Sequence, residues 1–182
     1  MPEGDTVYLA GKRLRAALAG QRLVRGELRH PRLVDHLGPD LLDPAWSAEH
    51  AAEALRRLTA RGASEIGMVL LEQRVMAGIG NLYKTETCFL RGISPWTPTR
   101  DVPDPAGLIT LARKLLVRNA DRPEQTTTGE LSRGRQHWVF ERAGQRCRRC
   151  GTRIRTAPQG DGVYARVAYW CPTCQPGPAP AR

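Results

Sequence analysis

The stretch Gly78-Ile79-Gly80-Asn81 separates two apolar segments, and the organisation of the chain is clearest from this point. The preceding segment, 64–76, has apolar residues at helical spacing and begins at Ser64, a residue type that caps helices. After the stretch, Asn81 is suited to cap a second helix that ends at Gly92. The sequence therefore predicts two helices joined by a glycine-rich turn.

This turn has the features of a phosphate-binding site. Gly78 suits the left-handed residue that ends a helix. Two glycines before Asn81 leave the backbone uncovered, so that free amides and the positive end of the second helix face outward together. The alternative is a tight turn between two core helices, because an isolated glycine-rich turn is weak evidence for a ligand.

Charge and composition favour a polyanionic partner. The chain has 182 residues, 41% of them hydrophobic, with a net charge of +10 and a pI of about 10.1. These values are in the range of nucleic-acid-binding proteins. No apolar run is long enough to span a membrane, and the start lacks a signal-peptide core, so we expect a cytoplasmic protein. In that compartment, paired cysteines are better metal ligands than disulfides.

The first 35 residues resemble the opening of a β-containing domain. Asp5 or Thr6 is placed to cap a helix that extends to about Ala19 and ends at Gly20. Residues 22–29 alternate loosely and predict a strand, which needs further strands as partners. The apolar side of the helix comprises Val7, Ala10, Leu14 and Leu18.

The chain from 36 to 143 is predominantly helical. A helix is predicted after Ser47, and Asp104-Pro105 is typical of a cap followed by a first-turn proline. Residues 121–135 predict a polar connection, and 136–142 a short amphipathic segment. The apolar residues of the two helices are Ala51, Ala54, Leu55 and Leu58, and Leu108, Ile109, Ala112, Leu115 and Leu116.

The section 144–175 predicts a separate zinc unit. Two C-x2-C pairs lie twenty residues apart, a spacing that closes a tetrahedral thiolate site. Between the pairs, 152–156 and 163–170 predict the strands of a hairpin. A redox role is the alternative, but four ligands leave no free thiol among them. The expected ligands of one structural Zn²⁺ are Cys147, Cys150, Cys171 and Cys174.

Two other features of this half concern cysteine and charge. Cys88 lies on an apolar helix beside Phe89 and is interpreted as a small core residue rather than a nucleophile. Arg166 lies near the predicted hairpin turn, where it is placed to reach DNA, whereas any single arginine is otherwise a solvated surface residue. The basic residues of the zinc unit are Arg146, Arg148, Arg149, Arg153, Arg155 and Arg166.

The amino terminus is a candidate reactive group. Methionine is usually removed before proline, which leaves Pro2 with a free secondary amine. An α-amino group has a reference pKa of about 7.7–8.0, so an appreciable fraction is neutral near pH 7 and is able to attack an aldehyde-like carbon. Glu3, its neighbour, is suited to proton transfer. The alternative is an ordinary chain start whose acidic residues favour a helix N-terminus.

Three pieces together resemble the formamidopyrimidine-DNA glycosylase and endonuclease VIII family. They are Pro2-Glu3-Gly4-Asp5-Thr6-Val7, the segment Gln73 to Asn81, and the end Tyr169-Trp170-Cys171-Pro172-Thr173-Cys174-Gln175. The start is most similar to actinobacterial endonuclease VIII members. The resemblance implies a bifunctional, monomeric bacterial DNA-repair enzyme, associated with the nucleoid, that removes oxidised bases, chiefly pyrimidines, and then cuts the strand at the abasic site. It also implies DNA with damaged bases or abasic sites as the partner.

The resemblance implies a role for each matching residue. Pro2 is the nucleophile that forms a Schiff base at C1′, and Glu3 is its acid/base partner. Asn81, in a helix–two-turn–helix with Gly78 and Gly80, holds phosphates that flank the lesion. Arg166 contacts the phosphate beside the lesion. Glu86 also matches an acidic position. The reaction then proceeds through β- and δ-elimination after the damaged nucleotide is flipped out of the stack.

The resemblance stops in the N-terminal half. Family members continue from near Pro31-Arg32 through further strands of a β-sandwich, which carry a catalytic lysine in a Gly-Lys-His context. Neither this stretch nor that context is present around Lys12, Lys84 or Lys114. The alternative is therefore a catalytically impaired, DNA-binding remnant of the family. A zinc-ribbon protein that binds RNA or protein explains the cysteines but not the amino terminus.

The resulting fold class is α+β with several domains. The sequence predicts an N-terminal helix with the start of a β-sandwich in 1–35 and a helical helix–two-turn–helix domain in 36–143. A zinc-finger β-hairpin follows in 144–175, with a disordered tail in 176–182. DNA is expected in the basic cleft between the two halves, with binding that weakens steeply as salt rises.

Overall fold

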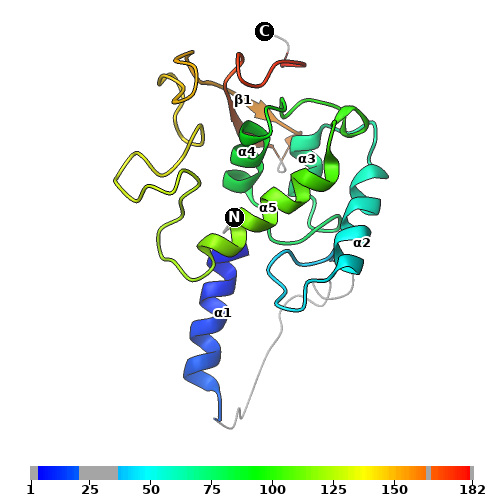
Figure 1. Cartoon of the computed structure of the whole chain (residues 1–182), viewed down its shortest axis with the longest axis vertical. Helices are drawn as coiled ribbons and strands as arrows, with labels where there is room; N and C mark the ends of the chain where they lie inside the picture. The colour runs from blue at the N-terminus through cyan, green and yellow to red at the C-terminus, as the bar shows by residue number, and fades with distance from the viewer. Residues whose placement is uncertain (1–3, 21–36, 163–164, 181–182) are drawn as a thin grey trace.

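The computed structural model describes residues 4–20, 37–162 and 165–180, and every structural statement below concerns these residues. These residues form five α-helices, a short 3₁₀-helix and a β-hairpin, and Figure 1 shows how they are arranged. In chain order these elements are α1 (Gly4–Leu18), α2 (Ala48–Thr59), α3 (Ile66–Leu71), α4 (Asn81–Leu90), η1 (Thr99–Asp101), α5 (Pro105–Asn119), β1 (Arg155–Gln159) and β2 (Arg166–Trp170).

Helix α4 is the centre of the fold. All of its residues from Leu82 to Phe89 are buried. Helices α3 and α5 pack against it, and β2 crosses another of its sides. The largest apolar side chains with no exposed surface, or almost none, are Leu41, Leu58, Ile66, Leu70, Met76, Ile79, Tyr83, Phe89, Leu108 and Leu116. The glycine-rich turn that precedes α4 is therefore attached directly to the core.

Helix α1 projects from this body. Its first turn lies beside α5, and its far end points away from the other helices (Figure 1). The predicted helix and its end are confirmed, with Gly20 at φ +81°. The predicted cap at Asp5 or Thr6 is wrong, because both residues lie inside the helix. Its predicted apolar side is largely exposed, with Val7 at 56%, Leu14 at 60% and Leu18 at 44%. The predicted strand at 22–29 lies outside the described residues.

The helix predicted over 64–76 is shorter in the structure. It begins after Glu65 rather than with Ser64 as its cap. The N–H groups of Ile66 and Gly67 donate to backbone carbonyls at positions 97 and 95, both at 2.9 Å, so a serine cap is not needed. The helix ends at Leu71, whose carbonyl accepts from the Gln73 side chain at 3.2 Å.

The other two helix starts are confirmed. Ser47 is the N-cap of α2 and forms a capping box with His50. Asp104 is the N-cap of α5, where its carboxylate accepts from the N–H of Gly107 at 2.8 Å. Pro105 occupies the first turn, as the sequence predicts. These local hydrogen bonds place the buried side of α5 against α4.

The predicted hairpin is present, but its first strand begins later than predicted. β1 and β2 pair in antiparallel register, with Arg155 opposite Trp170 and Gln159 opposite Arg166. The N–H of Ile154 instead donates to the carbonyl of Gln145 at 2.9 Å, which binds it to the first cysteine turn rather than to β2. The predicted strand 152–156 is therefore corrected to β1.

No helix within the described ranges combines the length and apolarity needed to cross a bilayer.

The C-terminal segment contacts the helical domain, because the Ser94 hydroxyl donates to the carbonyl of Pro178. The predicted division into 1–35, 36–143, 144–175 and 176–182 remains a prediction.

Candidate nucleic-acid interface and metal centre

The turn before α4 is shaped by the side chain of Gln73. Its Oε1 accepts from the N–H of Gly78 at 3.0 Å, and its Nε2 donates to the carbonyl of Ile79 at 2.9 Å. Gly78 adopts φ +108°, a conformation that L side chains rarely adopt. The predicted left-handed glycine is thus confirmed, although it lies in a turn held by a side chain and not at a helix end.

The segment around Asp40 supports this turn from one side. The N–H of Leu41 donates to the carbonyl of Ala77 at 3.1 Å, and the N–H of Ala77 donates to the carbonyl of Pro39 at 2.9 Å. Leu41 is fully buried beneath it. Residues 39–41 are therefore hydrogen-bonded alongside the glycine-rich turn.

The start of α1 is joined to the same turn. The N–H of Gly4 donates to the carbonyl of Gly78 at 2.9 Å. Asp5 is only 2% exposed, and its carboxylate accepts from the hydroxyl of Tyr83 and, at 2.6 Å, from the Gln125 side chain. Asp5 therefore lies within the first turn of α1 and binds α4, in addition to accepting from the N–H of Thr6 at 2.7 Å.

Asn81 has a different local role from the predicted one. Gly80 is the N-cap of α4, and Asn81 is its first residue. The side-chain Nδ2 of Asn81 donates to the carbonyl of Val167 at 2.9 Å, which ties α4 to β2. Its Oδ1 is buried without a hydrogen-bond partner among the described residues. Asn81 thus connects the turn to the strand that begins at Arg166.

Arg166 lies at the turn end of the hairpin, as predicted. It is the first residue of β2, half-buried, and its guanidinium donates to the carbonyl of Ala165 at 2.8 Å. Other arginines of the zinc unit bind the protein itself. Arg148 Nε donates to the carbonyl of His137 at 3.1 Å, and the Arg149 guanidinium lies 4.5 Å from the ring centre of Phe89.

Glu86 is a buried carboxylate that holds the polar connection against α4. It is fully buried and accepts from the backbone N–H groups of Trp138, Val139 and Phe140, each at 2.8 Å. The Thr127 hydroxyl donates to it as well. Several N–H groups aimed at one carboxylate satisfy its charge inside the protein. The predicted amphipathic segment 136–142 is therefore held by backbone contacts to Glu86.

The four predicted zinc ligands come together. The Sγ atoms of Cys147, Cys150, Cys171 and Cys174 all lie within 4.8 Å of one another. The Cys150–Cys171 and Cys147–Cys174 sulfur pairs are 3.4 and 3.9 Å apart. A tetrahedral Zn²⁺ with bonds of about 2.3 Å requires sulfur–sulfur edges of about 3.8 Å. The cluster therefore fits a structural metal ion.

The cysteines of the chain differ in acidity. Hydrogen bonds from Thr152 lower the pKa of Cys150 to about 6, whereas burial raises the pKa of Cys171 and of Cys174. Burial raises the pKa of Cys88 to about 12, and its side chain is fully buried. The interpretation of Cys88 as a core residue is confirmed.

The candidate catalytic residues Pro2 and Glu3 lie outside the described residues. Sequence reasoning missed Thr127 and Gln159, which belong to no motif and are distinguished only by their burial and their hydrogen bonds. It placed Asp5 and Gln73 within family motifs but did not predict their contacts with Tyr83 and with the glycine-rich turn.

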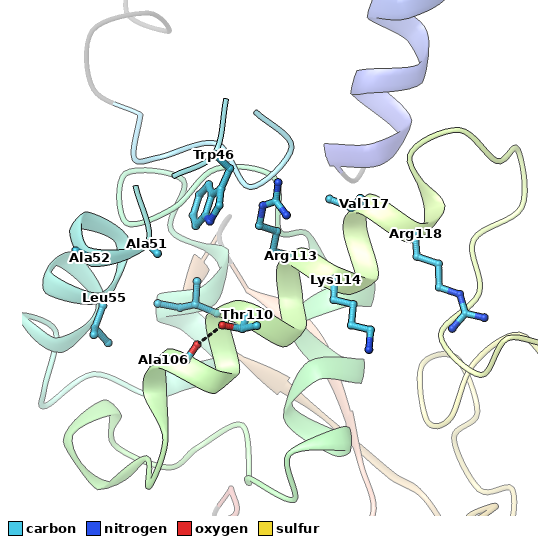
Figure 2. Close-up of a pocket in the computed structure, with 11 residues that line it drawn as sticks. Trp46, Ala51, Ala52, Leu55, Ala106, Thr110, Arg113, Lys114, Val117 and Arg118 are labelled. Carbon is cyan, nitrogen blue, oxygen red and sulfur yellow. Dashed lines mark hydrogen bonds between the residues drawn. The ribbon is translucent and has the colours of Figure 1, made fainter. Parts of the chain in front are cut away.

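A separate hollow of about 760 Å³ lies between α2 and α5 (Figure 2). Trp46 lies at one side, with the Arg113 guanidinium 5.4 Å from its ring centre. Lys114 and Arg118 continue the basic edge along α5. Its described lining contains no carboxylate, histidine or cysteine.

Comparisons with known proteins agree with this arrangement. The family described as "Formamidopyrimidine-DNA glycosylase H2TH domain" matches residues 37–119. The "Probable endonuclease 8 2" of Streptomyces coelicolor is 53% identical over 151 residues, covering 82% of this chain and 53% of the relative. The "DNA-(apurinic or apyrimidinic site) lyase Nei2" of Mycolicibacterium smegmatis is 46% identical over 142 residues, covering 78% and 54%.

Solved structures show the same fold. The MutM (Fpg) protein of Thermus thermophilus aligns with a TM-score of 0.65 and 28% identity, covering 85% of this chain and 59% of that one. Lactococcus lactis Fpg, in complex with DNA containing an abasic site, aligns with a TM-score of 0.61 and 26% identity, covering 78% and 52%. This chain thus spans about half the length of the curated relatives it matches.

The family assignment rests on both halves of the described chain. The helical domain carries the matched family region, and the cysteine cluster follows it in an Fpg-like fold. The chain therefore contains an H2TH domain of the formamidopyrimidine-DNA glycosylase and endonuclease VIII family.

Proposed function

We propose that this chain is part of a DNA-repair glycosylase with abasic-site lyase activity that acts on oxidised bases, chiefly pyrimidines. The observation that carries the proposal is the hydrogen bond between Gly4 and Gly78. It joins the chain start, which contains Pro2 and Glu3, to the turn suited to bind phosphate. This contact supports the proposal, in which the reactive amine belongs to a residue two positions before Gly4 in the sequence.

The proposed chemistry begins at Pro2. Its neutral amine attacks C1′ of a flipped nucleotide, and the bond from C1′ to the base breaks. The C1′–O4′ bond then breaks as O4′ takes a proton, which opens the sugar ring, and Glu3 provides the proton exchange that these steps need. The resulting iminium acidifies the C2′ proton. Its removal breaks the C3′–O bond, and a second elimination breaks the C5′–O bond, which releases both phosphates. Hydrolysis of the Schiff base then regenerates Pro2.

The DNA-binding residues act on the phosphates. The first turn of α4, with Gly78, Gly80 and Asn81, offers backbone N–H groups and the positive end of a helix. Arg166 supplies a second phosphate contact from the hairpin. We place DNA with damaged bases or abasic sites across this surface, bound by a monomer in the bacterial cytoplasm, at the nucleoid.

Zinc has a structural role in this proposal. Cys147, Cys150, Cys171 and Cys174 would hold one Zn²⁺, which supplies no chemistry to the reaction and closes the base of the hairpin. The rest of the domain organisation follows the sequence prediction, with a β-sandwich begun in 1–35, the helical domain in 36–143, the zinc finger in 144–175 and a tail in 176–182.

A catalytically impaired DNA-binding remnant is the second candidate, and the lysines favour it. Lys12 pairs with Asp121 at 2.5 Å, and Lys84 is fully buried near Gln159. Lys114 lies on α5 at the hollow beside α2. None of the three stands in the Gly-Lys-His context expected of the catalytic lysine.

Borohydride trapping separates the two candidates. The protein is incubated with a duplex that carries one abasic site, alongside a Pro2→Gly variant and an amino-terminally blocked sample, and its intact mass is measured. A covalent product that disappears in both controls supports the enzyme. No product from a protein of 182 residues that still binds the duplex would establish the remnant.

A further inference from the structure

Gln159 is an unusually buried polar residue at the turn end of the hairpin. It is the last residue of β1 and only 2% exposed, although glutamine is mostly found at protein surfaces. Its cross-strand partner is Arg166. Directly opposed residues share one face of a hairpin, so whatever holds Gln159 also holds the backbone that carries Arg166.

The amide of Gln159 uses its hydrogen-bonding capacity on the helical domain. Its Nε2 donates to the carbonyl of Pro95 at 2.8 Å and to the carboxylate of Glu65 at 2.9 Å. Its Oε1 lies 3.4 Å from the ammonium Nζ of Lys84, which is fully buried. Both donors and the acceptor of one side chain are thus engaged by three separate segments.

Gly67 provides the space for this side chain. A Cβ at Gly67 would lie 2.5 Å from Oε1 and 2.9 Å from Nε2 of Gln159. The N–H of Gly67 donates to the carbonyl of Pro95, the same carbonyl that Gln159 binds. The start of α3 and the loop at Pro95 therefore form a binding site for the Gln159 side chain, and the absence of a side chain at position 67 leaves room for it.

The other end of the hairpin is held by the cysteine cluster. Trp170, opposite Arg155, directly precedes Cys171. Gln159 and Arg166 lie four residues further along each strand, a distance of about 14 Å. A two-stranded hairpin is marginally stable alone, so a metal at one end does not fix the position of the other. Near the turn end, Asn81 holds the carbonyl of Val167 and Gln159 holds the opposite strand.

We propose that Gln159 is a positioning residue that sets Arg166 against the glycine-rich turn, so that Arg166 and the start of α4 act on the same DNA strand. This inference rests on the proposed DNA-binding function. Gln159 does not touch DNA in this proposal; it acts through the backbone of Arg166. The neutral amide of Gln159 lies between two opposite charges, the ammonium of Lys84 and the carboxylate of Glu65.

The test compares variants by the salt dependence of binding to an abasic-site duplex, followed by fluorescence anisotropy. Arg166→Ala removes one phosphate contact and should lower the log–log salt slope by about one, with about tenfold weaker binding. Gln159→Leu, which keeps the size and removes the amide, should reproduce both changes. The double variant should be no weaker than Arg166→Ala alone, because both act on one contact.

A second variant and two controls separate positioning from a loss of folding. Gly67→Ala displaces Gln159 without altering it and should give the same lower slope. Gly62→Ala is its matched control, because a Cβ there meets no atom closer than 3.5 Å. Thr156→Val, on an exposed residue of β1, is the control for the strand. Zinc content and thermal melting are measured for every variant.

The outcomes distinguish this inference from the proposed function. If the wild-type chain shows no salt-dependent binding to the duplex, the proposed function fails and the inference fails with it. If Arg166→Ala lowers the slope while folded Gln159→Leu and Gly67→Ala keep the wild-type slope, only the positioning role of Gln159 is wrong. A lower melting temperature with an unchanged slope also overturns it, because this is the behaviour of a purely structural residue.

Discussion

The N–H of Gly4 donates to the carbonyl of Gly78 at 2.9 Å, which joins the first described residue to the turn before the central helix. The two glycines meet closely: a Cβ at Gly4 would lie 2.5 Å from both the Cα and the carbonyl oxygen of Gly78. Because both partners are backbone atoms, neither is free to move aside as a flexible side chain would. Gly4 and Gly78 therefore pack together so closely that there is no space for a side chain at Gly4.

Gly4→Ala should separate the chain start from this turn. The added methyl forces Gly4 away from Gly78, and a displacement of about 1 Å near a reacting group costs about a hundredfold in rate. The yield of borohydride-trapped product over time measures the effect. Gly11→Ala is the control, since a Cβ there meets no atom within 4 Å. Equal trapping by both variants would show that the contact does not position the amine.

Glu86→Gln should destabilise the protein strongly. The carboxylate accepts from three backbone N–H groups and one hydroxyl, and an amide in its place turns an NH₂ toward some of these donors. We expect a loss of about 3 kcal/mol in the free energy of unfolding, measured by urea denaturation with zinc present. Glu124→Gln, at an exposed position, should change it little. A small loss for Glu86→Gln would mean that this connection is held by other contacts.

Cys88 should be unreactive in the native protein. Its pKa is raised to about 12 by burial, so at pH 8 only about one thiol in ten thousand is ionised, and the thiolate is the form that alkylates. Iodoacetamide followed by peptide mass analysis should leave Cys88 unmodified until the chain is unfolded. Any residual reactivity should rise with the thiolate fraction, about tenfold per pH unit, and level off only near the raised pKa. Labelling of native Cys88 at pH 8 would contradict its place in the core.

Removal of zinc should loosen the cysteine end of the hairpin. We expect one Zn²⁺ per chain. Cys174→Ser should lose it because one of the four thiolate ligands is removed, and a strong chelator should remove it by competing for the metal. Near-ultraviolet circular dichroism reports the change through Trp170, which packs 4.7 Å from Trp96 between ring centres. Cys88→Ser serves as the control for zinc content. Full zinc binding by Cys174→Ser would exclude that cysteine as a ligand.

The sequence by itself determined the features that depend on neighbouring residues. The caps at Ser47 and Asp104, the left-handed Gly78 and the two cysteine pairs follow from short-range hydrogen bonds and from spacing. These are set within a few residues of chain, so a pattern suffices to predict them. The family resemblance was visible for the same reason, because its motifs are short and local.

Only the tertiary structure decided where those pieces end and how they are held. Helix α3 begins without a serine cap because carbonyls at 95 and 97 bind its first N–H groups. The partners of Gln73, Glu86 and Gln159 do not follow from the sequence, since they lie on segments that the fold brings within reach. A buried polar group must find its hydrogen bonds wherever the packed chain supplies them, and that supply is a property of the folded molecule alone.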